Sequence, residues 1–145
     1  MHQIYPDGNG TNSGDNGLIG ILQRFISAGF HYHLFSNNVT IGTGTTLASL
    51  TEVTATGYAA VTVSSGAFTL VGLASHNGSV MASPIGFGTN SSGGSVNCYG
   101  YYVTDTSNTV LLAAANFDSA PVAVPNGSAF PLVVPVFGDF SQYTS

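Results

Sequence analysis

The hydrophobic positions of this chain follow a helical period near its beginning and change to short β-type runs at residue 30. Over 16–28 apolar side chains recur every three or four residues, which is the spacing of one face of an α-helix. This face contains Leu18, Ile19, Leu22, Phe25 and Ile26. Asp15 or Asn16 is placed to cap the first turn, and Gly29 to end the last one. The pattern predicts one helix over 16–28.

Seven short runs rich in apolar or β-branched residues follow, each bounded by turn-forming residues. They are 30–36, 58–63, 68–74, 80–85, 95–104, 110–116 and 130–136. Asn77 and Gly78 lie directly between two of these runs and predict a two-residue hairpin turn. Pro131 and Pro135 lack the amide hydrogen that a central strand donates, so we expect the last run to be an edge strand or to be broken.

The number of runs sets the expected fold class. Seven strands in a chain of 145 residues cannot hide their edges in one flat sheet, so we expect two packed sheets. The expected fold is mainly β, a two-sheet, jelly-roll-like β-sandwich with one N-terminal α-helix. The expected organisation is a flexible N-terminal arm over 1–14 and a single domain over 15–145 that includes the helix.

The arm ends in the stretch DGNGTNSGDNG, at 7–17, which places oxygen-bearing side chains at alternate positions like a calcium loop. With Asp7 as the first ligand, the sixth position of a helix-loop-helix site should be Gly and the twelfth Glu. The chain has Asn12 and Leu18 there. We therefore interpret the stretch as a tether that leads into the helix cap.

Charge narrows the partners that the protein can bind. Only 5% of residues are charged, Arg24 is the one Arg or Lys, and the formal net charge is −5. A nucleic-acid-binding protein needs several cationic side chains to displace counterions from phosphate, and an anionic membrane surface has the same requirement. We therefore expect neither nucleic acid nor membrane as a partner.

Two further absences shape the expectations. The sequence has no run of about 18 apolar residues and no basic-plus-apolar leader, so neither a membrane span nor a signal peptide is expected. Cys98 is the single cysteine, which excludes an intramolecular disulfide. A free cysteine of this kind is typically a small buried hydrophobic residue, and we expect Cys98 to be one.

His31 and His33 are the strongest candidate metal ligands, because residues i and i+2 of a strand point to one face. A metal site needs a third ligand, for which His76 or Asp105 is available. No spacing in the sequence predicts that either of them converges on the pair. We therefore expect these histidines to be polar strand residues or part of an oligomer interface.

No catalytic set is predicted. The Gly-x-Ser-x-Gly signature of hydrolases is absent, and the Gly-rich stretch 91–94 lacks the Lys and helix of a phosphate loop. The carboxylates lie mostly in loops, far apart in the sequence. They are Asp7, Asp15, Glu52, Asp105, Asp118 and Asp139. We therefore expect no catalytic, cofactor-binding or metal-binding residues and no cofactor.

A tyrosine-rich run offers one binding alternative. Tyr99, Tyr101 and Tyr102, with Asn97 and Asp105, could stack on and hydrogen-bond to a sugar, as in a carbohydrate-binding module. The structural interpretation is that Tyr99 and Tyr101 face one side of the strand and Tyr102 faces the other, each filling part of the core. We favour the structural interpretation.

Several short motifs resemble a pattern in small proteins that are encoded among the structural genes of tailed phages. The pattern has a helix, a strand ending Leu-Phe-x-Asn, a Thr-Leu-Ala-x-Leu-Thr-Glu segment, a Gly-Tyr pair, a tyrosine-rich strand and a Phe-x-x-x-Pro-Val segment. The matching stretches are LFSN at 34–37, TLASLTE at 46–52, GY at 57–58, CYGYYVTD at 98–105 and the segment 117–122. A closing apolar run ends near Pro135 and Phe137, and the resemblance covers roughly 15–139.

The resemblance implies a non-enzymatic virion protein, most simply a capsid cement or decoration subunit on the capsid surface. Its partners would be the major capsid protein and neighbouring copies, in a homotrimer. The low charge suits this role, because it lowers the electrostatic cost of packing identical copies together. The alternatives are a carbohydrate-binding or host-recognition module of a tail or fibre, and a metal-dependent enzyme that uses His31 and His33. The resemblance implies no site residues.

Overall fold

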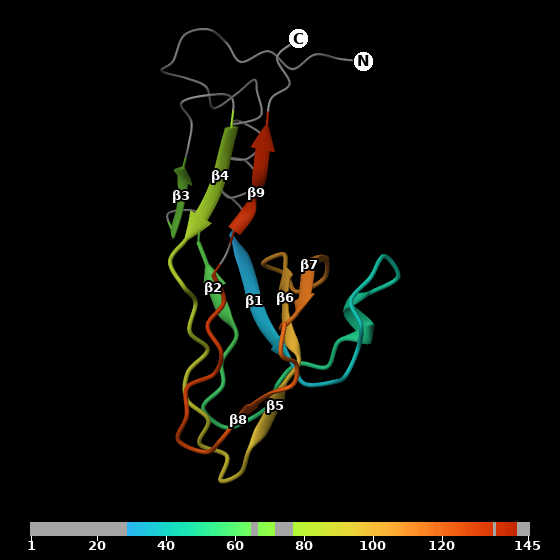
Figure 1. Ribbon diagram of the computed structural model, residues 1–145, viewed down its shortest axis with the longest axis vertical. Helices are drawn as coiled ribbons and strands as arrows, with labels where there is room; N and C mark the ends of the chain where they lie inside the picture. The colour runs from blue at the N-terminus through green and yellow to red at the C-terminus, as the bar shows by residue number, and fades with distance from the viewer. Residues whose placement is uncertain (1–28, 65–66, 72–76, 135, 142–145) are drawn as a thin grey trace, which may run out of the picture.

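The computed structural model describes residues 29–64, 67–71, 77–134 and 136–141. The arm predicted over 1–14, the calcium-loop alternative and the helix predicted over 16–28 lie outside these residues. Within the described part, the chain forms nine strands and one short 3-10 helix (Figure 1). The strands are β1 (Phe30–Phe35), β2 (Val61–Val63), β3 (Phe68–Val71), β4 (Asn77–Ala82), β5 (Val96–Cys98), β6 (Gly100–Thr104), β7 (Leu111–Asn116), β8 (Val122–Val124) and β9 (Val136–Ser141), and the helix is η1 (Leu47–Ser49).

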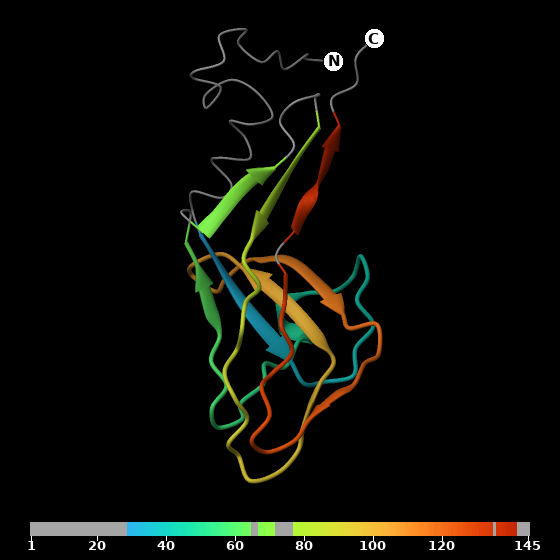
Figure 2. The ribbon, with the colours of Figure 1, turned by 60° about the vertical axis from the view of Figure 1, so that its left-hand side comes forward.

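All strand pairings are antiparallel, which confirms the prediction of a mainly β protein. A four-stranded sheet has the order β2-β1-β6-β7, a three-stranded sheet the order β3-β4-β9, and β5 pairs with β8. The three-stranded sheet lies at one end of the molecule, the four-stranded sheet in the middle and the β5-β8 pair toward the other end (Figure 2). In the middle sheet β1 and β6 pair from His31↔Thr104 to Phe35↔Gly100.

The main core lies on one face of the four-stranded sheet. Successive side chains of a strand point to opposite faces, so Phe30, Tyr32 and Leu34 share the core face of β1. Opposite them pack two extended segments, 85–90 and 129–133, which are joined by the bridges Ile85↔Val133 and Thr89↔Ala129. The remaining buried members are Val53, Val63, Ile85, Phe87, Cys98, Val103, Val124, Phe130 and Val133.

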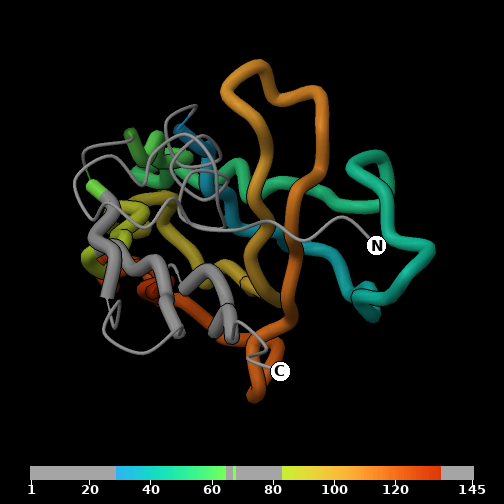
Figure 3. The backbone as a smooth tube through the Cα atoms, turned by 90° about the horizontal axis from the view of Figure 1, so that it is seen from above, coloured from blue at the N-terminus to red at the C-terminus, as the bar shows by residue number. Residues whose placement is uncertain are grey.

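A smaller cluster covers the other face of the same sheet. Phe35, Leu50 and Tyr102 are buried in it, beneath the segment 36–52 that carries η1. The Asn116 side chain fastens this segment to β7, because its amide donates to the carbonyl of Val39 and its oxygen accepts from the amide of Ile41. Seen from above, the segment 36–52 (teal) and the β6–β7 connection (orange) project from the body of the protein (Figure 3). Both projections contribute residues that line one pocket with His33, Leu50 from the first and Asn108 from the second.

The Asn77-Gly78 pair does not form the predicted two-residue turn. Strands β3 and β4 are antiparallel neighbours, and their described pairing runs from Phe68↔Ala82 to Val71↔Ser79. Asn77 and Gly78 belong to β4 and pair with Ser141 and Phe140 of β9. Pairing with a third strand therefore takes precedence here over the turn preference of Asn-Gly.

Two other runs are divided differently from the prediction. The run 95–104 is interrupted at Tyr99, so that β5 pairs with β8 and β6 pairs with β1 and β7. The run 130–136 contains no continuous strand over 130–134, which confirms the alternative that it is broken; β9 begins only at Val136. Pro131 contributes no amide hydrogen to this segment. Strand β8 was not predicted.

Candidate functional site

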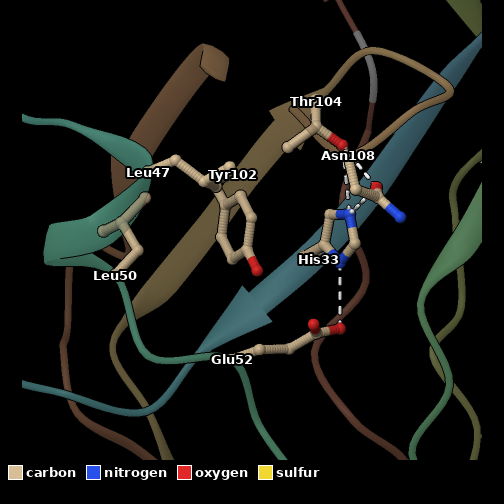
Figure 4. A pocket seen from close by; sticks show the side chains of 7 residues that line it. All are labelled: His33, Leu47, Leu50, Glu52, Tyr102, Thr104 and Asn108. Atoms are coloured by element: carbon tan, nitrogen blue, oxygen red, sulfur yellow. Dashed lines mark hydrogen bonds and ion pairs between the residues drawn. The ribbon is translucent and has the colours of Figure 1, made fainter. Parts of the chain in front are cut away.

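A pocket of about 240 Å³ opens on the face of the four-stranded sheet that is partly covered by the segment 36–52 (Figure 4). Its lining combines polar groups from the sheet and the β6–β7 connection with two leucines from the covering segment. The lining residues are His33, Leu47, Leu50, Glu52, Tyr102, Thr104 and Asn108.

His33 is placed by the strand period of β1. It alternates with Tyr32 and Leu34, which point into the main core, and so faces the pocket. Tyr102 is its direct cross-strand partner on β6. The two rings stack with centroids 4.6 Å apart and an interplanar angle of 9°. The residue is only 5% exposed, so its imidazole is a buried polar group that needs hydrogen-bond partners.

Glu52 provides one of these partners. It forms a β-bridge with Phe35, which brings its side chain alongside β1. Its Oε1 atom lies 2.9 Å from Nδ1 of His33 and accepts a hydrogen bond from the Tyr58 hydroxyl at 3.0 Å. The Tyr58 hydroxyl in turn accepts a 3.0 Å hydrogen bond from the amide of Leu34. The Glu52 carboxylate thus links His33 of β1 to Tyr58, and the Tyr58 hydroxyl links back to the backbone of β1 at Leu34.

Asn108 provides the partner on the other side of the imidazole. Its Oδ1 atom lies 2.8 Å from the Thr104 hydroxyl, 2.8 Å from Nδ1 of His31 and 3.2 Å from Nε2 of His33. Asn108 has a φ of 56°, in the left-handed region that Asn tolerates better than most residues. An asparagine at position 108 therefore has two roles. It tolerates the left-handed backbone conformation of the turn, and its side-chain oxygen lies within hydrogen-bond distance of both histidines.

Asp105 holds the same turn from outside the pocket. Its Oδ1 atom accepts hydrogen bonds from the amides of Val110 at 2.9 Å and Thr109 at 2.8 Å. These hydrogen bonds, with that from Val110 the strongest influence, lower the pKa of Asp105. The Asp105 carboxylate is committed to the backbone of the turn, so it stabilises the conformation that presents Asn108.

The two pocket-side tyrosines keep their protons. Burial raises the pKa of Tyr58 and of Tyr102, and the neighbouring Glu52 carboxylate raises both further. A protonated phenol donates a hydrogen bond, whereas a phenolate beside a carboxylate would repel it. Glu52 therefore has a protonated phenol from Tyr58 as a hydrogen-bond donor and a second protonated phenol, from Tyr102, close by.

Thr104, His33 and Glu52 lie in the order of the nucleophile, base and carboxylate of a catalytic triad. Nε2 of His33 lies 3.3 Å from the Thr104 hydroxyl, and its Nδ1 contacts Glu52. Two observations argue against nucleophilic chemistry at Thr104. The residue is only 1% exposed, and its hydroxyl makes its shorter hydrogen bond, of 2.8 Å, to Asn108. The arrangement works as a structural link between three segments.

His31 and His33 share one face as predicted, with ring centroids 6.1 Å apart. The proposed third ligand Asp105 is not brought to them, because its carboxylate binds the turn amides; His76 lies outside the described residues. Among residues 29–64, 67–71, 77–134 and 136–141, no three His, Cys, Asp or Glu side chains form a group suited to a metal ion. Both histidines instead converge on Asn108.

The tyrosine-rich run does not have the predicted arrangement. Tyr99 packs in the cluster of Phe35 and Tyr102, whereas Tyr101 packs against the main core with Phe117. The expectation that Tyr99 and Tyr101 share a side is wrong, because the break between β5 and β6 at Tyr99 interrupts the alternation. The expectation that Tyr102 faces the side opposite to Tyr101 is confirmed.

Two other sequence candidates are structural. Cys98 is fully buried, as predicted, and burial raises the pKa of its thiol to about 11. The Gly-rich stretch 91–94 is held by the buried side chain of Asn90, which donates to the carbonyls of Gly94 and Val124, both at 2.8 Å. Neither feature presents a group to the pocket.

Sequence reasoning did not single out the pairing of His33 with Glu52 and Asn108. These residues are separated by 19 and 75 positions, and only the register of β1 with β6 and the bridge at Glu52 bring them together. The available signal was weak: Glu52 closes one of the motifs of the phage-like pattern, and Asn108 lies in a turn-rich stretch.

When the chain is compared with known protein families, curated proteins and solved structures, no match is found in any of the three. The resemblance to tailed-phage structural proteins therefore stays a prediction. Within the described part of the chain, no helix has the length and hydropathy needed to cross a membrane.

Proposed function

We propose that this protein is a non-enzymatic virion structural protein, a capsid cement or decoration subunit that binds the major capsid protein and neighbouring copies. The observation that carries the proposal is a set of exposed apolar side chains on a β scaffold with almost no charge. Leu132 is 64% exposed, Val110 51%, Val134 50% and Leu112 37%. Contiguous exposed apolar patches mark surfaces that bind other proteins, and Leu132 and Val134, two residues apart on one extended segment, are the part of this set that we infer to form one.

The alternation within 130–134 supports a contact role for that segment. Val133 points into the core and exchanges two backbone hydrogen bonds with Ile85, whereas Leu132 and Val134 point outward. The outward side chains are therefore held by a fixed backbone. A rigid apolar surface loses little conformational entropy when a partner binds.

The hydrogen bonds among the pocket residues themselves support the non-enzymatic part of the proposal. His33 has partners at both ring nitrogens, and the Thr104 hydroxyl is buried and hydrogen-bonded. Among the described residues, every buried side-chain nitrogen or oxygen has a hydrogen-bond partner.

We further propose that the sheets form a jelly-roll-like sandwich and that three copies assemble on the capsid.

Mass spectrometry and cryo-electron microscopy of purified virions test the proposal. We expect the protein to be present in virions and to appear as density on the outside of the head. Leu132→Ser combined with Val134→Ser should lower its occupancy on the capsid while leaving the melting temperature nearly unchanged. A protein that is found only in the lysate of infected cells, and never in virions, would overturn the proposal.

The carbohydrate-binding alternative has one observation in its favour, since Tyr102 lines a pocket beside a carboxylate. One ring face of Tyr102 is covered by His33, and the residue is 5% exposed, so no open stacking surface is available. A glycan array separates the two functions. Specific glycan binding that Tyr102→Phe abolishes without unfolding the protein would favour the alternative.

A further inference from the structure

The unused hydrogen-bonding capacity of the pocket is concentrated on one carboxylate. An ionised carboxylate offers about four acceptor positions. The donors of His33 and Tyr58 fill two of them, and the Tyr102 hydroxyl beside the carboxylate fills at most a third. The Glu52 side chain is 37% exposed, so its remaining capacity is accessible to a ligand.

Several other polar atoms of the pocket are already engaged. Oδ1 of Asn108 faces three possible donors, and both ring nitrogens of His33 and the hydroxyl of Thr104 have partners. No Lys or Arg lines the pocket. A ligand that binds the open side of the Glu52 carboxylate brings hydrogen-bond donors, and the carboxylate favours a positive charge on it.

The opposite wall of the pocket is apolar. Leu47 and Leu50 flank Tyr102 on the side away from His33, and the Tyr102 hydroxyl points toward Glu52 (Figure 4). A carboxylate at one end and aliphatic side chains at the other suit a group that combines a short hydrocarbon stem with a cationic tip. Long basic side chains have this construction.

We propose that the pocket binds the side chain of an arginine from a partner protein. The guanidinium group donates to Glu52, and the aliphatic stem lies against Leu47 and Leu50. Arginine fits better than lysine, because its planar group presents several donors in a fixed geometry that matches a carboxylate. The proposal deepens the proposed function, since it names the chemistry by which the partner is recognised.

The composition of the chain favours a different protein as the source of this arginine. The chain contains one Arg or Lys, Arg24, against six acidic residues. A partner rich in basic side chains has more ways to supply the group and is attracted by the net charge of −5. Each copy of this chain could offer only Arg24.

The test titrates the full-length protein with a capped Gly-Arg-Gly peptide and monitors binding through the chemical shifts of the backbone amides in two-dimensional NMR spectra. We expect saturable shifts of the backbone amides around Glu52, Leu50 and Asn108, with weak affinity. The same peptide with citrulline, which is neutral and nearly isosteric with arginine, should bind about tenfold more weakly. Equal binding of the two peptides, or no saturable shift with either, would overturn the proposal.

A matched pair of variants locates the interaction. Glu52→Gln keeps an acceptor for His33 and Tyr58 and should weaken arginine binding about tenfold. Asp118→Asn removes the same charge at an exposed position outside the pocket and should leave binding unchanged. If Glu52→Gln does not fold, the comparison of arginine with citrulline on the unchanged protein still decides the question. Equal weakening by both variants would show only a general effect of charge.

Two further measurements show which protein supplies the arginine, and distinguish a failure of the pocket proposal from a failure of the proposed virion function. If Arg24→Gln and Glu52→Gln abolish self-association equally in light scattering, the arginine comes from a second copy and the proposed partner is wrong. If the peptide binds as expected but the protein is absent from virions, the pocket is correct and the virion function fails. If the peptide does not bind and the protein is present in virions, only the pocket proposal fails.

Discussion

The Nδ1 atom of His33 lies 2.9 Å from Oε1 of Glu52, so a strand of the four-stranded sheet is tied directly to the segment that covers it. The opposite ring nitrogen lies 3.2 Å from Oδ1 of Asn108, in the connection between β6 and β7. One side chain thereby joins three segments that are separate in the sequence. This linkage is the part of the site that mutation can test most directly.

Replacing His33 by Ala should lower the free energy of unfolding by about 1–3 kcal/mol, because the buried partners of the imidazole lose hydrogen bonds. Urea-induced unfolding followed by tyrosine fluorescence measures the change. The control is His31→Ala, whose side chain makes one hydrogen bond to Asn108 in a more exposed position. We expect a smaller loss there, and an equal loss in both variants would contradict the linking role of His33.

Alkaline pH should destabilise the protein through its buried tyrosines. Burial is the main cause that raises the pKa of Tyr32, Tyr58 and Tyr102 above the ordinary value of 10.0. A group with a raised pKa in the folded state contributes its full stability below the unfolded pKa. This stability is lost as the pH rises above about 10, because the unfolded chain then releases protons that the folded chain retains.

Urea titrations from pH 8 to pH 11, with tyrosinate absorbance recorded in parallel, measure this dependence. Tyr102→Phe removes one of the three groups and should make the decline in stability shallower. Native tyrosines that all titrate like free tyrosine, or a stability that rises over this range, would contradict the prediction.

Gly57 should not tolerate a side chain. It has a φ of 87°, and a Cβ atom placed there would overlap the carbonyl oxygen of Thr89. We expect Gly57→Ala to cost about 1–3 kcal/mol of unfolding free energy. Gly42 has open space around it, and Gly42→Ala should change stability by no more than about 0.5 kcal/mol. Thermal and urea melts of the two variants test the difference, and similar values would contradict it.

Cys98 should react slowly with thiol reagents in the folded protein. The residue is fully buried, and the pKa of its thiol is raised to about 11, so little thiolate is present at pH 8 and none of it is accessible. We expect labelling by a chromogenic disulfide to follow unfolding, with a rate that rises steeply as urea is added. Rapid stoichiometric labelling without denaturant would show that the site is open.

Strands that are set by a local sequence pattern were predicted from the sequence, whereas strands that depend on a distant partner were not. Strand β1 was predicted with its correct start because the alternation of Phe30, Tyr32 and Leu34 is local and places three large apolar side chains on one face. Strand β8 was missed because it contains only three residues, directly after Pro121. Short strands of this kind are stabilised mainly by their partner and carry little signal of their own.

The pocket could not be predicted for a related reason. His33 was recognised as a residue of interest, but its neighbours depend on which strand pairs with β1 and in which register. The sequence offers several strands as possible partners, and a shift of one residue would turn His33 into the main core. Asp105, which the sequence offered only as an available third metal ligand, is engaged by the turn amides of Thr109 and Val110 instead.

The pairing of β1 with β6 also has a consequence for synthesis on the ribosome. His31 pairs with Thr104, so β1 emerges about 70 residues before its partner has been translated. At roughly 5–20 residues per second, the edge of Phe30–Phe35 that pairs with β6 waits about 4–14 s for its partner. During that interval a chaperone, or a strand from another nascent chain, can occupy the place that β6 takes later. Yield in a heterologous host should therefore respond to translation speed between these two strands.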